Sequence, residues 1–315
     1  YNQYFHKLKP FDRLRSLYLL GYSSLIAAEF EKTEHFTKKA LEIARPAGIG
    51  IIEEINLVIL SKAEMIQGKL DQAYQHGLKA LHSAEKANHT SIIIAANCIL
   101  GDILYAVGNV TAAAQYYRIG QIREGLSNVS FYGIENRIHL SHLLAWTGQI
   151  SEARQILHNC LAYSEKFKLE QFYVDEVLVC GYCDFHESEL ETAEEKFNKA
   201  IQAAEANGLQ LELSLGKLSQ ARLMMAKKEN TAARKLLDES LEISQQKNMA
   251  WQISYGLELS MRLDKINHQT ELLNQHQTAY QDHIKKIKEN MQSEALRKEF
   301  SEARKVWDQE HHFPS

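Results

Sequence analysis

The sequence has few residues that interrupt a helix. Its 315 residues include only 3 Pro and 15 Gly, and the prolines stand at 10, 46 and 314. A proline inside a helix removes a backbone hydrogen bond and clashes with the preceding turn. Their scarcity predicts that more than 260 consecutive residues are free to be helical.

The sequence also has little net charge, few cysteines and no long apolar run. A net charge of -4 and a pI near 6.4 leave no basic surface for phosphate groups, so we expect no nucleic-acid partner. No apolar run approaches the roughly 20 residues of a membrane-spanning helix, so we expect no membrane partner. Four cysteines are too few for a disulfide framework, which indicates a reducing compartment and a cytoplasmic location.

A turn motif recurs every 40 residues along the chain. In three copies a glycine precedes a small alanine by five residues: Gly68 and Ala73, Gly108 and Ala113, Gly148 and Ala153. Two degenerate copies follow at the same interval, over 188–193 and 228–233. Self-similarity at a fixed period is the signature of a repeat architecture.

Other positions keep the same register. Small residues come seven positions before each turn and twelve after it: Gly21, Ser61, Gly101, Ser141, Gly181 and Ala221, then Ala40, Ala80, Gly120, Cys160, Ala200 and Ser240. A mostly bulky column lies four residues after each turn alanine: Gly77, Tyr117, Leu157, Phe197 and Leu237. Small facing residues let two antiparallel helices approach closely, and bulky ones fill the space between neighbouring pairs.

These columns resemble the tetratricopeptide repeat (TPR), over roughly residues 12 to 268. The resemblance implies an all-α fold, a right-handed α-α superhelix of about seven antiparallel helix pairs with a C-terminal capping helix. The period exceeds the usual 34 by about six residues, and the closing proline of the motif is missing. We therefore expect helices longer by about a turn than those of the standard repeat.

The periodicity also predicts boundaries. The expected pairs are 11–28 with 33–46, 50–67 with 71–87, 90–107 with 111–126, 130–147 with 151–167, 169–186 with 190–206, 210–227 with 231–247, and 249–265 with 269 onward. We predict an upstream remnant or linker over 1–10, the solenoid over 11–268, and a last helix, capping helix and tail over 269–315. Within the tail, 290–310 is expected to be a solubilising cap with a polar outer face. Asn88, Asn128, Asn207 with Gly208, and Asn248 are expected to end second helices.

Two motifs have residue types and spacings that occur in metal or redox sites. Cys180 and Cys183, with His186 after them, fall inside an expected helix, whereas redox CxxC motifs lie at strand-to-helix junctions and closed zinc sites need four ligands. His139 and His142 lack the glutamate and the i, i+4 spacing of a zinc protease. We interpret both motifs as packing residues and predict no metal site.

The TPR resemblance implies that first helices line the inner groove, with the residue after the small inter-helix position pointing into it. That column is polar and differs in every repeat, and aromatic residues follow three or four positions later. Large amphipathic side chains suit recognition because they give contact area at little entropic cost. We predict a ligand or partner groove formed by Tyr22, Lys62, Asp102, Tyr105, Glu135, Arg137, His142, Trp146, Tyr182, Phe185, Arg222 and Arg262.

Segments 40–45, 241–244 and 287–300 resemble the superhelical sensor domains of MalT-like signal-transduction ATPases. That resemblance implies the regulatory region of a larger bacterial signalling or transcription-regulating protein, whose groove binds a protein, a peptide or a small effector. A first residue of Tyr1 rather than Met agrees with an excised piece. The alternative is a stand-alone TPR scaffold that grips an extended or helical peptide. No phosphate loop or nucleophile elbow is present, so we predict no catalytic residues and no cofactor.

Overall fold

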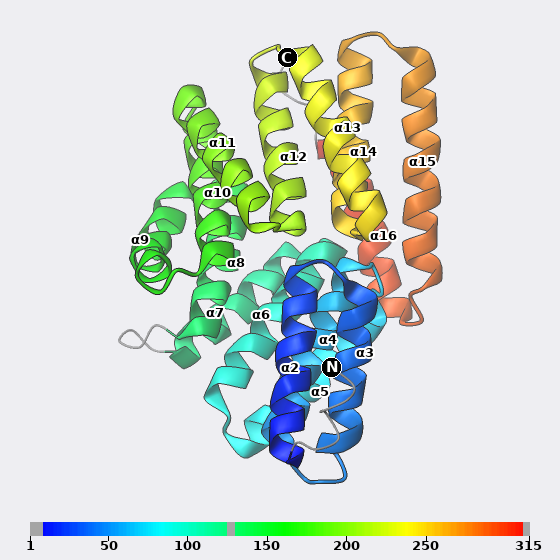
Figure 1. Ribbon diagram of the computed structural model, residues 1–315. Coiled ribbons are helices and arrows are strands. Elements are labelled where there is room, and N and C mark those ends of the chain that lie inside the picture. The colour runs from blue at the N-terminus through cyan, green and yellow to red at the C-terminus, as the bar shows by residue number, and fades with distance from the viewer. Residues whose placement is uncertain (1–8, 125–129, 311–315) are drawn as a thin grey trace.

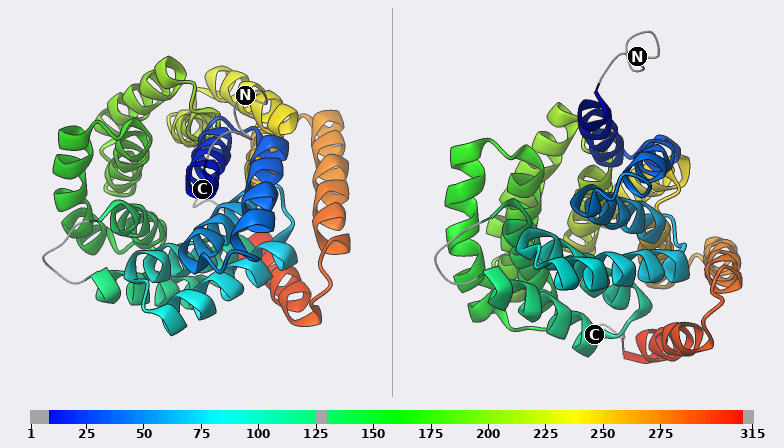
Figure 2. Two further views of the ribbon diagram at one scale, coloured as in Figure 1. Left: turned by 60° about the horizontal axis from the view of Figure 1, so that its bottom comes forward. Right: turned by 90° about the horizontal axis from the view of Figure 1, so that it is seen from below.

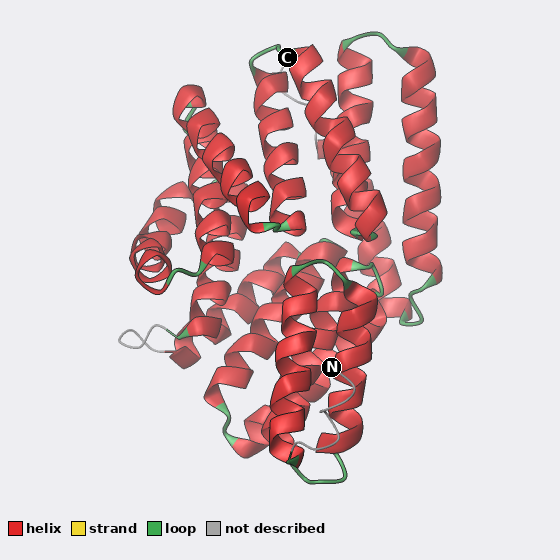
Figure 3. Ribbon diagram, in the orientation of Figure 1, coloured by secondary structure: helices red, strands yellow, loops and turns green. Residues whose placement is uncertain are grey.

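The computed structural model describes residues 9–124 and 130–310, and every regular element in these ranges is an α-helix (Figure 3). The helices are α2 Pro10–Ile26, α3 Phe30–Ala44, α4 Gly50–Ile66, α5 Leu70–Ala87, α6 Thr90–Val107, α7 Val110–Glu124, α8 Phe131–Trp146, α9 Ile150–Phe167, α10 Glu170–His186, α11 Leu190–Asn207, α12 Gln210–Ala226, α13 Asn230–Lys247, α14 Ala250–Ile266, α15 Thr270–Glu289 and α16 Glu294–Glu310. Consecutive helices from α2 to α15 pack against one another as antiparallel neighbours (Figure 1). The expected all-α, TPR-like superhelix is confirmed.

The predicted helix ends are accurate to within three residues from α2 to α14. Asn88, Gly208 and Asn248 occupy the left-handed region at helix C-termini, with φ of 57°, 69° and 54°. This conformation lets the next backbone N–H groups bond to carbonyls of the last turn, which ends a helix and turns the chain. Asn128 lies outside the described residues.

The small and bulky columns interlock between helices. A Cβ added to Gly101 would lie 2.5 Å from the ring of Tyr117, and one added to Gly181 would lie 2.6 Å from the ring of Phe197. Both rings are almost fully buried, Tyr117 at 2% exposure and Phe197 at 1%. The glycines are therefore present because a neighbouring ring fills the space where a side chain would stand.

The superhelix closes on itself. Figure 2 shows the helices wound around a common centre, so that early and late helices meet. Met249, just before α14, is fully buried in a cluster that contains Leu25 of α2 and Ile66 of α4. Two segments about 180 to 220 residues apart in the sequence thus share one apolar cluster, which fixes the curvature of the array.

The C-terminal segment has an outer and an inner face. Glu294, Arg297 and Lys298 are exposed, as a polar cap requires. The inner side is buried, since Met291 and Phe300 belong to the main core and α16 contacts α6. This segment therefore also joins the last repeat to the third.

Asp71 of α5 holds the start of α16 in place. Its Oδ2 accepts the backbone N–H of Ser293 at 2.6 Å and also that of Gln292. Backbone N–H groups at the start of a helix have no partner within the helix, so a carboxylate there satisfies them and interacts favourably with the helix dipole.

By length and composition, α6 is the only helix among the described residues that could cross a membrane. Of its 18 residues, 72% are buried among neighbouring helices.

Candidate functional site

The inner faces of the first helices line a cavity of about 180 Å³. Its lining residues come from α4, α6, α8, α10, α12 and α14, with Tyr117 contributed by α7. The wall is mainly apolar, interrupted by a limited polar set: Lys62, Asp102, His139, His142, Gln171, Asp175, Glu212 and Gln252. A mostly apolar hollow with a few convergent polar groups is the usual form of a ligand site.

Among the described residues, Lys62 is the only lysine or arginine that lines this wall. Its ammonium group forms an ion pair with Glu135, across from α4 to α8, and each side chain is 17% exposed. Burial lowers the pKa of Lys62, but the nearby charges of Glu135 and Asp102 outweigh burial and raise this pKa above its ordinary value. Lys62 is therefore protonated at neutral pH, and Glu135 already neutralises it.

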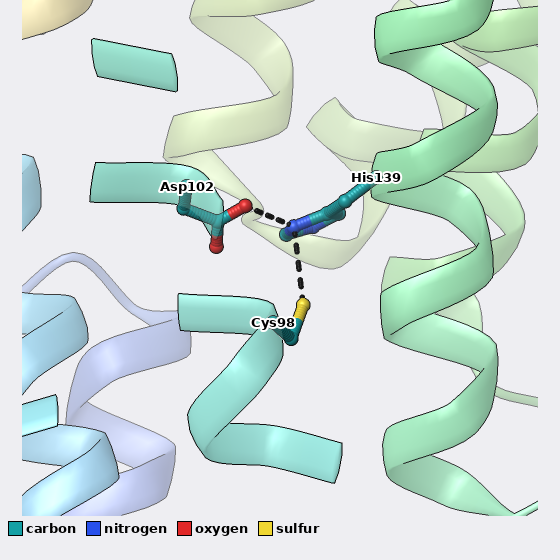
Figure 4. A group of neighbouring side chains, drawn as sticks. All are labelled: Cys98, Asp102 and His139. Carbon is teal, nitrogen blue, oxygen red and sulfur yellow. Dashed lines mark hydrogen bonds and ion pairs between the residues drawn. The ribbon is translucent and has the colours of Figure 1, made fainter. Parts of the chain in front are cut away.

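Asp102, His139 and Cys98 form a compact polar cluster at one side of the cavity (Figure 4). Asp102 Oδ1 accepts the Tyr117 hydroxyl at 2.7 Å and lies 2.6 Å from His139 Nδ1, which is itself 3.5 Å from Cys98 Sγ. Burial lowers the pKa of His139, but Asp102 raises it well above its ordinary value. Burial also raises the pKa of Cys98 to about 12, so the sulfur is a thiol.

These three side chains do not form a nucleophile relay. In a Cys–His–Asp relay the carboxylate bonds to one ring nitrogen and the sulfur to the other. Here Asp102 and Cys98 both contact Nδ1 of His139. The geometry instead gathers three donor atoms around one point.

Asp175 of α10 and Glu212 of α12 bring two carboxyl groups to the same wall. Among the described residues neither forms an ion pair, and Oε2 of Glu212 is buried without a hydrogen bond. Burial raises the pKa of Asp175 well above its ordinary value, and the charge of Glu212 raises it further. Burial likewise raises the pKa of Glu212. The cavity wall therefore holds two carboxyl groups whose charged form burial disfavours, and the charge of Lys62 offsets this effect only in part.

Aromatic rings complete the wall. The Tyr182 hydroxyl lies 2.6 Å from Ser219 Oγ, and its ring centre lies 5.2 Å from that of His142. The Arg222 guanidinium stacks over Trp146 at 4.8 Å and over Phe185 at 5.0 Å. Burial lowers the pKa of His142 to about 4, so its imidazole is neutral at pH 7.

The structure brings together most of the predicted groove residues. Five line the cavity itself: Lys62, Asp102, Tyr105, His142 and Tyr182. The other seven do not line it. Two of these contact a lining residue: Glu135 pairs with Lys62, and Trp146 packs edge-on against Tyr182. Arg222 lies over the rings of Trp146 and Phe185. The remaining three are Tyr22, Arg137 and Arg262.

Those three side chains are occupied by packing. Tyr22 contacts the ring of Phe131 at 6.0 Å, and Arg262 donates to Glu258 at 2.7 Å on the same helix. Arg137 is only 8% exposed.

Sequence reasoning missed several cavity residues: His139, Gln171, Asp175, Glu212, Trp251 and Gln252. The repeat did contain a signal for two of them. Forty residues before and after His139 stand Ile99 and Val179, so an imidazole there breaks an apolar column. In the column of Asp175, Ile55, Ala95 and Leu215 are apolar, and only Asp175 and Glu135 carry carboxyl groups among these five positions. A polar exception in an apolar column marks a position where packing does not determine the residue.

No protein-family model and no curated protein sequence matches the chain. Several solved structures share the fold. A Rap protein complexed with competence and sporulation factor matches with a TM-score of 0.57 and 11% identity, over 95% of this chain and 97% of that chain. The apo form of RapI matches with a TM-score of 0.59 and 13% identity, over 75% and 84%. A tetratricopeptide repeat protein from Parabacteroides merdae matches with a TM-score of 0.48 and 16% identity, over 92% and 98%.

Such identities relate the folds alone. Together with the helical hairpins, the likeness to the Rap structures shows that this chain has a TPR-like helical repeat fold.

Proposed function

We propose that the superhelix binds a peptide segment in its cavity and that Asp175 and Glu212 receive a Lys or Arg side chain of that peptide. The observation that carries this proposal is the pair of carboxyl groups in the cavity wall, neither of which forms an ion pair among the described residues. Leaving a carboxylate buried and unpaired costs free energy. A cationic side chain of the peptide would supply the ion pair that the folded chain alone lacks.

The other residues of the cavity wall also suit a peptide with a Lys or Arg side chain. Charge-assisted hydrogen bonds from guanidinium or ammonium groups to carboxylates are about twice as strong as neutral ones. The apolar stem of Lys or Arg can lie along rings such as those of Tyr182 and Trp251, while its charged end reaches the carboxyl groups. The charge of Lys62 lowers the pKa of both carboxyl groups, but the ion pair of Lys62 is with Glu135.

We further propose that peptide binding serves regulation in a larger cytoplasmic signalling protein. The cavity lies between helices of the second to seventh pairs, and the two ends of the array are joined by Met249 and by α16. A ligand that prefers one curvature of the array would shift the population of that curvature. The MalT-like sequence resemblance and a Rap structure that contains competence and sporulation factor support this proposal by analogy.

Display of random peptides on the purified chain tests the binding proposal. We expect the retained peptides to be enriched in Lys or Arg, and their binding to be lost in the double variant Asp175→Asn/Glu212→Gln. The amides keep the shape of the carboxyl groups and remove their charge. Titration calorimetry of selected peptides gives the affinity, and circular dichroism shows whether each variant is folded.

A matched control removes two exposed carboxylates from α3, with Glu31→Gln/Glu42→Gln. This change alters the net charge equally and leaves the cavity intact, so peptide binding should persist. Equal binding by the cavity variant and the wild type would overturn the proposal, as would selected peptides without enrichment in cationic residues.

A further inference from the structure

Three potential metal ligands converge at the edge of the cavity. The nearest donor atoms of Cys98, Asp102 and His139 all lie within 4.8 Å of one another. Cys98 and Asp102 stand one turn apart on α6, and His139 reaches them from α8 (Figure 4). Ligands from two helices that already pack together need little rearrangement to surround an ion.

The donor set and its spacing suit a zinc-like ion. Zinc binds sulfur at about 2.3 Å and nitrogen or oxygen at about 2.0–2.2 Å, so tetrahedral geometry places its donor atoms about 3.3–3.6 Å apart. The distance of 3.5 Å between Cys98 Sγ and His139 Nδ1 already falls in this range. The 2.6 Å contact between His139 and Asp102 needs to open by less than about 1 Å.

The repeat itself gives an independent reason to look for a ligand here. The column of His139 contains Ile59, Ile99 and Val179, which are all buried. An aliphatic side chain therefore satisfies the packing at this position in three other repeats. The imidazole is an exception that repeat packing does not require, and it lies beside a thiol and a carboxylate.

The fourth coordination position would face the cavity. Asp102 and His139 belong to the cavity wall, whereas Cys98 is 2% exposed behind them. Zinc sites with three protein ligands and one accessible position can hold water or a ligand group in the fourth. The Tyr117 hydroxyl donates a hydrogen bond to Asp102 and would hold this carboxylate in position without itself contacting the ion.

We infer that Cys98, Asp102 and His139 form a site for Zn²⁺, or for a similar borderline divalent ion, with one coordination position open to the cavity. This proposal differs from the sequence prediction of no metal site, which considered the His139–His142 pair and the Cys180–Cys183 pair separately. Spacing along the sequence could not show that two residues of α6 lie beside a residue of α8.

Titration of the chelator-treated, reduced chain with Co²⁺ tests the site. Cobalt substitutes for zinc, and a cysteine ligand gives a thiolate-to-cobalt absorption band in the near ultraviolet. We expect this band, together with visible bands of tetrahedral cobalt, at one equivalent of metal. Added Zn²⁺ should abolish both by displacement and should raise the melting temperature by mass action.

Variants of each ligand assign the site. Cys98→Ser, Asp102→Asn and His139→Val should each weaken Co²⁺ binding by more than about 100-fold, above the effect typical of outer-sphere changes. His139→Val introduces the residue that the next repeat carries at Val179, so this variant should fold normally. Its circular dichroism and melting curve check that expectation.

The second pair of cysteines provides the control. Cys180→Ser/Cys183→Ser removes two thiols on α10 and should leave the cobalt spectrum unchanged. The inference is wrong if wild-type protein gives no thiolate–cobalt band. It is also wrong if that band survives in Cys98→Ser and disappears in Cys180→Ser/Cys183→Ser.

Discussion

The contacts between helices and the wall of the cavity follow opposite rules. Between helices, each small residue faces a large one, as Gly101 faces Tyr117 and Gly181 faces Phe197. In the cavity wall, the corresponding position changes from repeat to repeat, from Lys62 to Asp102 to His142. The first set is determined by volume, whereas the second includes buried charges that destabilise the fold unless something compensates them.

The difference separates residues that build the superhelix from residues that give it a function. A packing position tolerates a change of residue only when the volume is conserved. A binding position can be costly to the folded state and still be retained, because its compensation comes from the ligand. Substitutions in the two regions should therefore have opposite effects on stability.

The largest effect is expected where packing is tightest. Gly101→Leu places a side chain where the ring of Tyr117 stands and should reduce the free energy of unfolding by about 3 kcal/mol. Gly101→Ala should also destabilise, since its Cβ alone meets the ring at 2.5 Å. Urea denaturation measures both variants. Gly50→Ala is the control, because its nearest neighbour is 3.6 Å away and the change should stay within about 0.5 kcal/mol.

A carboxyl group in the packing region should show a pH effect. Glu176 is fully buried, it accepts a hydrogen bond from Ser164 at 2.8 Å, and burial raises its pKa to about 7. Because the folded-state pKa lies above the unfolded one, the folded state holds the extra proton, and stability is lost as pH rises from about 4.5 to 7.

Relative to Glu176→Gln, which cannot titrate, the wild type should lose about 2 kcal/mol of unfolding free energy between pH 5 and 8. Denaturation at both pH values gives this difference. Parallel pH profiles of the two proteins would show that Glu176 has an ordinary pKa in the folded chain.

A smaller effect is expected at the junction that closes the superhelix. Asp71→Ala removes the acceptor for the backbone N–H groups of Gln292 and Ser293, so it should cost about 1 kcal/mol, as the loss of a helix cap does. Hydrogen exchange should increase chiefly in α16. A uniform increase along the chain would mean that Asp71 stabilises α5 and its neighbours instead.

The sequence predicted the packing region far better than the cavity. Small and bulky residues repeat at an interval of 40, so the register of α2 to α14 followed from the sequence. The return of α16 to α6 did not follow, since a contact between Phe300 and the main core depends on the accumulated curvature of all the repeats.

The cavity was predicted in part for the same reason. Lys62, Asp102 and His142 were found because they share one column. Asp175 and Glu212 belong to different columns of different helices, and only the three-dimensional fold brings both to one wall. Pairing between columns is not visible in a single repeat.

The unfolding free energy of Asp175→Asn/Glu212→Gln at pH 8 tests most directly whether the interior of the superhelix is a binding site rather than a packing core. The raised folded-state pKa values of these groups mean that stability falls as pH rises, and amides escape this loss. We predict that the double variant is more stable than the wild type by at least about 1 kcal/mol, while Glu31→Gln/Glu42→Gln is unchanged. A double variant less stable than the wild type would show that the two carboxyl groups support the fold and would contradict the account.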